Sequence, residues 1–324
     1  MMAMGGVLMI GRGVARDIAR ASAIALLLWG GCAQEKKPAG GPAAGANQPT
    51  FATPEAAIEA LMDAARKGDR DRLAAIFGPD LDRLSSGDQM VDDVDLQLLA
   101  AAYDRKHGLA DQTPESVTLT VGENDWKFPA PVVKSGNTWF FDTPAGVEEV
   151  IARRIGNNEF DAMRTCVAYV TAQEGYAKTD PDGDHVPDYA PKLLSTPGTR
   201  DGLIWPDEMG EPRSFFGPEV AAARAAGEKV GEGRGYHGYH FRQLDSQGPG
   251  AQGGAKSYLD AKGNMTGGFA LIAWPAAYNE TGVMSFLVGQ AGAVYQKDLG
   301  PNTATAADSI TSFDPANGWV AVIH

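Results

Sequence analysis

Apolar and polar positions take on a helical period close to residue 51, just after a stretch rich in Ala, Gly and Pro. Thr53-Pro54-Glu55 provides an N-cap, a proline suited to the first helical position and an early acidic side chain. Apolar residues then recur three and four positions apart, at Ile58, Leu61, Met62 and Ala65. The pattern predicts a helix that ends at Gly68, followed by shorter helices over residues 72–77 and 94–105.

Strand-like segments follow these helices. Residues 116–121, 126–133 and 138–141 are expected to form strands, and Ser135-Gly136-Asn137 supplies a hairpin turn between the last two. This helical lead and curved meander resembles the cone-shaped nuclear-transport-factor-2-like fold. Cones of this kind hold enzymes and binding modules alike, so the resemblance implies no function.

Few groups in this first half suit catalysis. His107 is its only histidine and is expected at a helix end. Asp92, Asp93 and Asp95 form a carboxylate run, which is expected on a solvated helix face.

The second half begins with a helical pattern over residues 147–176, as one helix or as two that meet at Gly156-Asn157-Asn158. Its apolar stripe is expected to consist of Phe160, Met163, Val167 and Val170. Cys166 lies beside that stripe, where a buried core residue is the simplest interpretation. Four short strands are predicted next, over residues 236–244, 267–274, 283–288 and 293–299.

The predicted fold class is therefore α+β. Helices packed on a curved antiparallel sheet come first, and a long helix with a second antiparallel sheet follows. The predicted domains are a signal peptide over residues 1–31, a flexible tether over 32–50, and two α+β domains over 51–145 and 146–324. The second boundary is placed in the turn-rich segment 142–146.

The N-terminus has the pattern of an export signal. Arg12, Arg16 and Arg20 precede an apolar run over residues 21–28 that is too short to span a bilayer. The segment then ends in Leu-Trp-Gly-Gly-Cys, which resembles the lipobox of bacterial lipoproteins with Cys32 as the acylated residue. An ordinary signal peptide with a chance cysteine is the alternative. Ala33 after the cysteine favours an outer-membrane lipoprotein on the periplasmic side of the envelope.

Charge and cysteine content limit the classes of partner that the chain can bind. The chain has 324 residues, 44% hydrophobic and 21% charged, with a formal net charge of −13. Nucleic acid is an unsuitable partner, because its recognition requires a basic surface. The expected partners are the membrane, through Cys32, and an envelope protein or glycan. Cys166 is the other of two cysteines, so no disulfide is expected if Cys32 is acylated.

Several motifs carry a resemblance. Residues 157–206 (NNEFDAMRTCVAYVTAQEGYAKTDPDGDHVPDYAPKLLSTPGTRDGLIWP), then GYHFRQLDSQGPGAQGGA, GGFALIAWPAAYNETGVMSF and VYQKDLGPNTA, resemble the exported bacterial family called domain of unknown function 2950. The resemblance implies an exported envelope protein and brings no known activity. More distantly, the order of these segments resembles the globular heads of type II secretion pseudopilins. Charged residues such as Arg153 and Arg154 exclude a membrane-spanning role for the helix.

The sharpest chemical motif is Asp180-Pro-Asp-Gly-Asp-His-Val-Pro-Asp188. Carboxylates at alternate positions, Asp180, Asp182 and Asp184, with Asp188 at the ninth, suit a hard cation such as calcium. The alternative is a solvated turn, because Asp, Gly and Pro are also ordinary turn residues.

His237 and His240 form an HxxH pair. Positions three apart on a regular strand point to opposite faces, so the two rings are not expected to share one ion. Together with Trp205 and Trp274 they are candidates for a surface that binds a carbohydrate or a peptide, although core packing is the commoner use of tryptophan. Gly248–Gly253 matches GxGxxG, but Pro249 removes a backbone donor and no long helix follows, which excludes a dinucleotide site.

The sequence thus favours a lipid-anchored envelope protein with a binding or scaffolding role rather than an enzyme. The alternative is a hydrolase that uses His237 or His240 with a nearby acid such as Asp245, or a pocket in the first domain.

Overall fold

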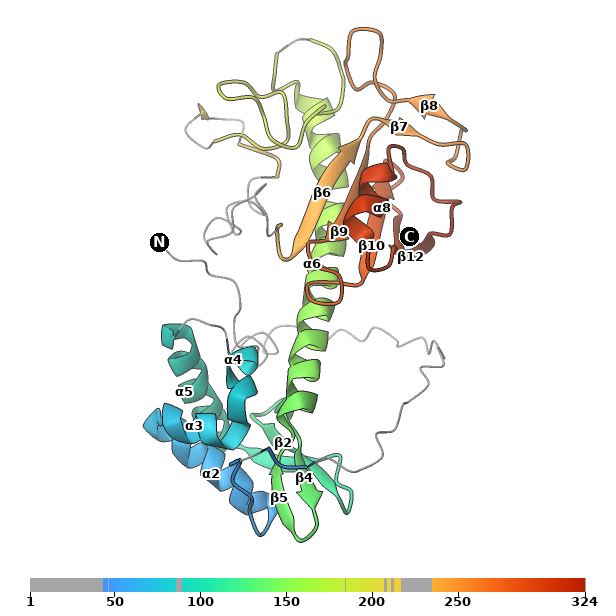
Figure 1. The fold of residues 1–324 in the computed structure, drawn as a ribbon. Helices are drawn as coiled ribbons and strands as arrows, with labels where there is room; N and C mark the ends of the chain where they lie inside the picture. The colour runs from blue at the N-terminus through green and yellow to red at the C-terminus, as the bar shows by residue number, and fades with distance from the viewer. Residues whose placement is uncertain are drawn as a thin grey trace. The chain divides into compact units, whose positions relative to one another are not determined.

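A computed structural model describes residues 43–45, 47–85, 89–183, 185–206, 209–210, 213–216 and 235–323 (Figure 1). The predicted signal peptide and Cys32 lie outside these residues. The chain forms two compact units that meet in the sequence between Arg153 and Arg154. Both units combine helices with antiparallel sheets, which confirms the α+β prediction.

The first unit opens with helices whose ends follow from local sequence. The Thr53 hydroxyl accepts a hydrogen bond from Ala56 N (3.2 Å), and Gly68 ends the first helix in the left-handed conformation (φ 62°). The helices are α2 (Pro54–Lys67), α3 (Arg70–Phe77), the 3₁₀ turn η1 (Gly78–Asp80), α4 (Leu81–Leu84) and α5 (Gln89–Arg105).

These helices pack with a small antiparallel sheet in which the strand order is β1-β2-β4-β5 and β3 pairs with β2. The strands are β1 (His107–Ala110), β2 (Ser116–Val121), β3 (Trp126–Lys127), β4 (Val132–Ser135) and β5 (Thr138–Phe141). Strand β1 was not predicted, since its sequence HGLA lacks β-branched and aromatic residues. His107 begins this strand, directly after α5, and stacks on Tyr103 with the ring centroids 3.8 Å apart.

The carboxylates of α5 correct one expectation. Asp92 and Asp95 are only 8% and 5% exposed, so the carboxylate run does not form a solvated face. Asp92, Asp95 and Leu99 recur at spacings of three and four residues, which places them on the same inward face of the helix. Tertiary packing therefore decides which side of this weakly patterned helix is buried.

A single helix, α6 (Thr143–Thr179), begins in the first unit and ends in the second. It continues through Gly156-Asn157-Asn158, so the version with two helices is wrong. Its predicted apolar stripe is also wrong in part, because Phe160 and Val167 are 48% and 41% exposed. Cys166 and Tyr169 are fully buried instead.

The second unit is built on a five-stranded antiparallel sheet with the order β12-β11-β10-β9-β6. Its strands are β6 (Tyr239–Leu244), β9 (Ala270–Pro275), β10 (Met284–Gly289), β11 (Val294–Asp298) and β12 (Val320–Ile323). The first four correspond to the four predicted strands, and β12 was not predicted. A separate two-stranded sheet is formed by β7 (Ser246–Gln247) and β8 (Lys256–Ser257).

Helices cover both faces of the five-stranded sheet (Figure 1). On one face α6 packs against the residues around β9, where Tyr169 donates a hydrogen bond to Ala270 O (3.2 Å) and lies edge-on to Phe269. On the other face lies α8 (Thr303–Ser309). Arg242 of β6 donates hydrogen bonds to Ala307 O in this helix and to Ile310 O directly after it. No helix in the described part of the chain is long and apolar enough to cross a membrane.

Candidate functional site

A cavity of about 320 Å³ lies beside strand β6 in the second unit. We call it the β6 cavity. Two of the predicted binding residues, His240 and Trp274, line it. Its other lining residues are Thr165, Leu193, Leu194, Ile204, Phe216, Gly235, Tyr236, Tyr239, Phe241, Arg242 and Leu271.

The position of β6 explains why the cavity forms there. This strand is at the edge of its sheet and pairs only with β9 within that sheet. Side chains alternate along it, so Tyr239 and Phe241 point to the face that α6 covers, whereas His240 and Arg242 point to the face of α8. The cavity therefore follows the free edge of β6 and meets side chains from both faces.

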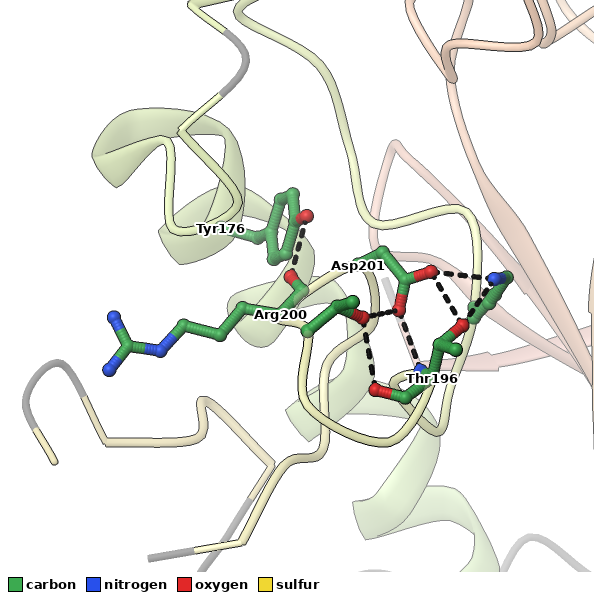
Figure 2. Close-up of polar contacts among 6 residues, drawn as sticks. Tyr176, Thr196, Arg200 and Asp201 are labelled. Carbon is green, nitrogen blue, oxygen red and sulfur yellow. Dashed lines mark hydrogen bonds and ion pairs between the residues drawn. The ribbon is translucent and has the colours of Figure 1, made fainter. Parts of the chain in front are cut away.

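One wall of the β6 cavity comes from the loop that contains Leu193, Leu194 and Ile204. Its two ends are joined by a parallel bridge between Leu194 and Ile204, with a hydrogen bond from Ser195 N to Ile204 O (2.8 Å). Tyr176 of α6 fixes the loop from outside by donating to Arg200 O (2.9 Å), as Figure 2 shows. These bonds hold the wall in one arrangement.

Asp201 organises the interior of that loop (Figure 2). Its carboxylate accepts hydrogen bonds from Lys192 Nζ (2.6 Å), Thr196 N (2.7 Å), Thr196 Oγ1 (2.8 Å) and Thr199 Oγ1 (2.8 Å). Partial desolvation acts to raise the pKa of Asp201, but these donors outweigh it and hold the pKa well below the usual range of aspartate. Asp201 is thus a structural anion that positions the cavity wall.

His240 supplies a neutral polar group to the β6 cavity. Its ring lies 5.6 Å from the ring of Trp274, the cross-strand partner of His240 on β9. Burial lowers the pKa of His240 below the usual range of histidine, because the low-dielectric surroundings disfavour the charged imidazolium. Among the residues that the structure describes, no carboxylate lies within ion-pair distance of this ring. At neutral pH His240 is therefore uncharged.

Arg242 supplies the only cation that lines the β6 cavity, counted over the described residues. Its Nη2 donates to Ala307 O (2.6 Å) and Ile310 O (2.8 Å) at the end of α8, and its guanidinium lies 5.9 Å from the centre of the Trp274 ring. Its Nε is buried and has no hydrogen-bond partner within the described structure, where no carboxylate forms an ion pair with this side chain. A half-buried positive charge therefore lines the cavity, and none of the described carboxylates pairs with it.

The sequence motifs did not indicate Arg242, although one signal for it was present. It lies two residues after His240, and residues two apart on a strand share a face. The motif HxxH drew attention to His237 instead.

The other two predicted binding residues lie outside the β6 cavity lining. His237 occupies a turn before β6, with a left-handed backbone (φ 46°), and its ring contacts Tyr236. Trp205 is only 4% exposed and packs edge-on against Phe215, with the guanidinium of Arg200 over its ring. Trp205 therefore belongs to the core.

The acidic loop after α6 is partly described. Asp180 accepts hydrogen bonds from Gly183 N and His185 N, both at 3.1 Å, and forms an ion pair with the His185 ring at 3.2 Å. Asp188 is buried, with 4% of its surface exposed, and Asp184 lies outside the described residues. No group of three or more His, Cys, Asp or Glu side chains within the described part is arranged to hold a metal ion. Without Asp184 this does not test the calcium site, which stays a prediction.

The fold and the cavity define an α+β protein with a cavity lined by aromatic side chains, a neutral histidine and an arginine that no described carboxylate neutralises. Comparison with protein families shows that residues 48–322 match the family described as "Protein of unknown function (DUF2950)". The chain belongs to this family. No curated protein and no solved structure matches the chain. The likeness of the second half to pseudopilin heads, and of the first to nuclear-transport-factor-2-like cones, stays a prediction.

Proposed function

We propose that this chain is an exported, lipid-anchored envelope protein whose β6 cavity binds a small ligand that carries a carboxylate on an aromatic or apolar body. The observation that supports the proposal is Arg242, a cation in the wall of a mainly apolar cavity that has no acidic partner among the residues that the structure describes.

The electrostatic argument starts from the cost of burying a charge. A desolvated guanidinium is unfavourable unless hydrogen-bond acceptors or an anion compensate for the lost water. The carbonyls of Ala307 and Ile310 at the end of α8 satisfy part of the five-donor guanidinium, and within the described structure Nε has no partner. A ligand carboxylate suits the remaining donors, because its two oxygens match the planar fork of arginine.

The other lining residues indicate the size and the chemical character of the uncharged part of the ligand. Tyr236, Phe241 and Trp274 provide aromatic surface, and Leu193, Leu194 and Leu271 provide aliphatic surface. Rings bind such walls through apolar contact and stacking. The volume of about 320 Å³ is close to the lower end of ligand pockets, about 300 Å³, so the ligand is small. Neutral His240 is available to hydrogen-bond an uncharged polar group of the ligand.

The same geometry favours binding over the hydrolase alternative. A histidine base is usually oriented by an acid, and none lies near the His240 ring in the described chain. Asp245 is five positions further along the chain, roughly 16 Å away if the strand geometry continues. Asp245 therefore does not serve His240.

Export and anchoring rest on the N-terminal pattern of Arg12, Arg16 and Arg20, a short apolar run, and Gly-Gly-Cys32. The test is incorporation of a fatty-acid analogue by cells that produce the protein. Cys32→Ser should abolish labelling and release the protein from the membrane fraction. Unchanged labelling of Cys32→Ser would refute the lipid anchor without affecting the binding proposal.

Ligand binding is tested with matched probes that differ only in charge. Indole-3-propionate and indole-3-propanol are titrated into the protein by calorimetry. The carboxylate should bind roughly tenfold to hundredfold more tightly than the alcohol, as expected for a hydrogen bond to a charged group. Arg242→Met should remove that preference.

Arg200→Met is the matched control, because Arg200 also donates to a backbone carbonyl, Met209 O (2.7 Å), and stacks on a tryptophan outside the β6 cavity. It should retain the preference for the carboxylate. Equal binding of both probes by the unmodified protein, or an unchanged preference in Arg242→Met, would overturn the proposal.

A further inference from the structure

The first unit contains a cavity of its own, of about 250 Å³. We call it the first-unit cavity. Its apolar lining comes from α2, α3, α4 and α5, from the segment that joins β3 to β4, and from the first-unit part of α6. The apolar side chains are Leu61, Leu73, Phe77, Leu81, Leu84, Leu96, Leu99, Phe128, Pro129 and Val150.

The charged groups of this cavity balance one another. Arg70 and Arg153 line it, and so do Asp82 and Asp92. Arg70 Nη2 is 2.6 Å from Asp93 Oδ1 and donates to Gln89 O, so its charge has a partner.

Arg153 also has an acidic partner. Its Nε lies 2.7 Å from Glu149 Oε1, and its Nη1 donates to Lys127 O (2.9 Å). Neither arginine resembles Arg242, which has no acidic partner in the described part of the chain. An anion therefore gains little here, whereas it gains a partner in the β6 cavity.

The size and lining of the first-unit cavity indicate what it holds. At about 30 Å³ per water molecule, it has room for several waters, but apolar walls offer few of the polar partners that ordered water requires. An apolar cavity of about 150 Å³ is large enough to bind benzene. The first-unit cavity is larger and has polar groups, Ser85 and Gln89, in its lining.

We propose that the first-unit cavity is a second ligand site, which takes a neutral molecule with one medium-length aliphatic chain and a hydrogen-bonding end. The chain contacts the leucine and phenylalanine walls. The uncharged polar end reaches Ser85 or Gln89. The site is separate from the β6 cavity and differs from it in preferring an uncharged ligand to a carboxylate.

The test uses the full chain with Cys32→Ser, so that no acyl group of the protein itself competes for the cavity. The neutral fluorophore N-phenyl-1-naphthylamine is bound first and is then displaced by linear alcohols from hexanol to decanol, or by decanoate. Each added methylene should raise the affinity of the alcohol by about fourfold until the chain fills the cavity. With Arg242→Met also present, so that decanoate has no cation to bind in the β6 cavity, decanol should displace the probe at least tenfold better than decanoate at neutral pH.

Matched variants assign the site. Leu96→Trp fills the first-unit cavity from α5 and should weaken decanol binding at least tenfold. Leu98→Trp adds the same bulk on an exposed position of the same helix and should leave it unchanged. Val150→Phe fills the cavity from α6 and gives an independent variant if Leu96→Trp does not fold, as judged by its melting temperature.

Arg242→Met should leave decanol binding intact, which separates this proposal from the function proposed for the β6 cavity. Equal affinity for decanol and decanoate, or full decanol binding by folded Leu96→Trp or Val150→Phe, would overturn the proposal.

Discussion

Replacing Asp201 with asparagine should loosen the loop between Lys192 and Ile204, which forms one wall of the β6 cavity. The substitution keeps the size of the side chain but replaces one carboxylate oxygen with an amide group that donates. That amide then faces donors from Lys192, Thr196 and Thr199, all within 2.8 Å of the present carboxylate. At least one donor loses its acceptor, and the charge-assisted contact with Lys192 becomes an ordinary one.

The magnitude follows from those contacts. A hydrogen bond to a charged group contributes about 1.5–3 kcal/mol, but the Asp201 side chain is 28% exposed and water partly replaces what is lost. We expect a loss of about 2 kcal/mol in the free energy of unfolding. For a unit of the size of Arg154–His324, this corresponds to a fall in Tm of about 4–8 °C.

The loss should depend on pH with a defined sign. The pKa of Asp201 is lower in the folded chain than its ordinary value of about 3.9 in an unfolded one. The ionised carboxylate therefore stabilises the fold fully above that unfolded value, and this contribution disappears as the pH falls through the folded pKa. The difference in stability between the native protein and Asp201→Asn should be constant from neutral pH down to about pH 5 and should shrink below about pH 4.

Differential scanning calorimetry over that pH series measures the effect. Asp245→Asn serves as the control, because Asp245 is exposed and its carboxylate has no hydrogen bond within the described structure. Two results would refute the reasoning: a Tm for Asp201→Asn equal to that of the control at neutral pH, or a difference that does not change between neutral pH and pH 3.

Three further predictions concern other parts of the chain. If calcium binds the loop from Asp180 to Asp188, the Tm should be higher in millimolar calcium than in chelator, and the double variant Asp182→Asn/Asp184→Asn should abolish this rise. Equal Tm values of the native protein in the two buffers would show that the loop is a solvated turn. Complete burial raises the pKa of the Cys166 thiol to about 12, so a thiol reagent should label it only after denaturation, and rapid labelling of the folded protein would contradict its burial. In Gly282→Ala the new methyl group would overlap the buried Tyr239 side chain, which should lower the free energy of unfolding by about 3 kcal/mol. Gly156→Ala, in open space on α6, should instead raise it by about 0.5–1 kcal/mol. Urea unfolding measures both variants, and equal effects would exclude a steric cause.

The local elements of this protein could be predicted because their signals are local. The cap at Thr53, the proline at the start of α2 and the left-handed Gly68 all act within a few residues of the helix that they delimit. The strands β2 and β5 agree with the predicted ranges, since each carries the alternation of its own pleat. The α+β class follows from such elements taken together.

Burial within the helices could not be predicted from hydrophobicity alone. Phe160 and Val167 have the more apolar side chains, yet α6 buries Cys166 and Tyr169. Tyr169 is buried because Ala270 O accepts a hydrogen bond from its hydroxyl and Phe269 lies against its ring. Both partners are about a hundred positions away in the sequence. In the same way, Asp92 of α5 lines a cavity rather than a solvated surface.

The candidate site shows the same division. The sequence by itself determined that His240 and Arg242 share one face of a strand, because that depends only on the two-residue period of an extended chain. Three facts depended on the tertiary structure. Trp274 is the cross-strand neighbour of His240, and the carbonyls of Ala307 and Ile310 accept hydrogen bonds from one nitrogen of Arg242. Within the described chain, no carboxylate pairs with either side chain. Register, edge position and the packing of α8 are set by contacts between residues distant in sequence, and these contacts determine which polar group in the cavity lacks a partner.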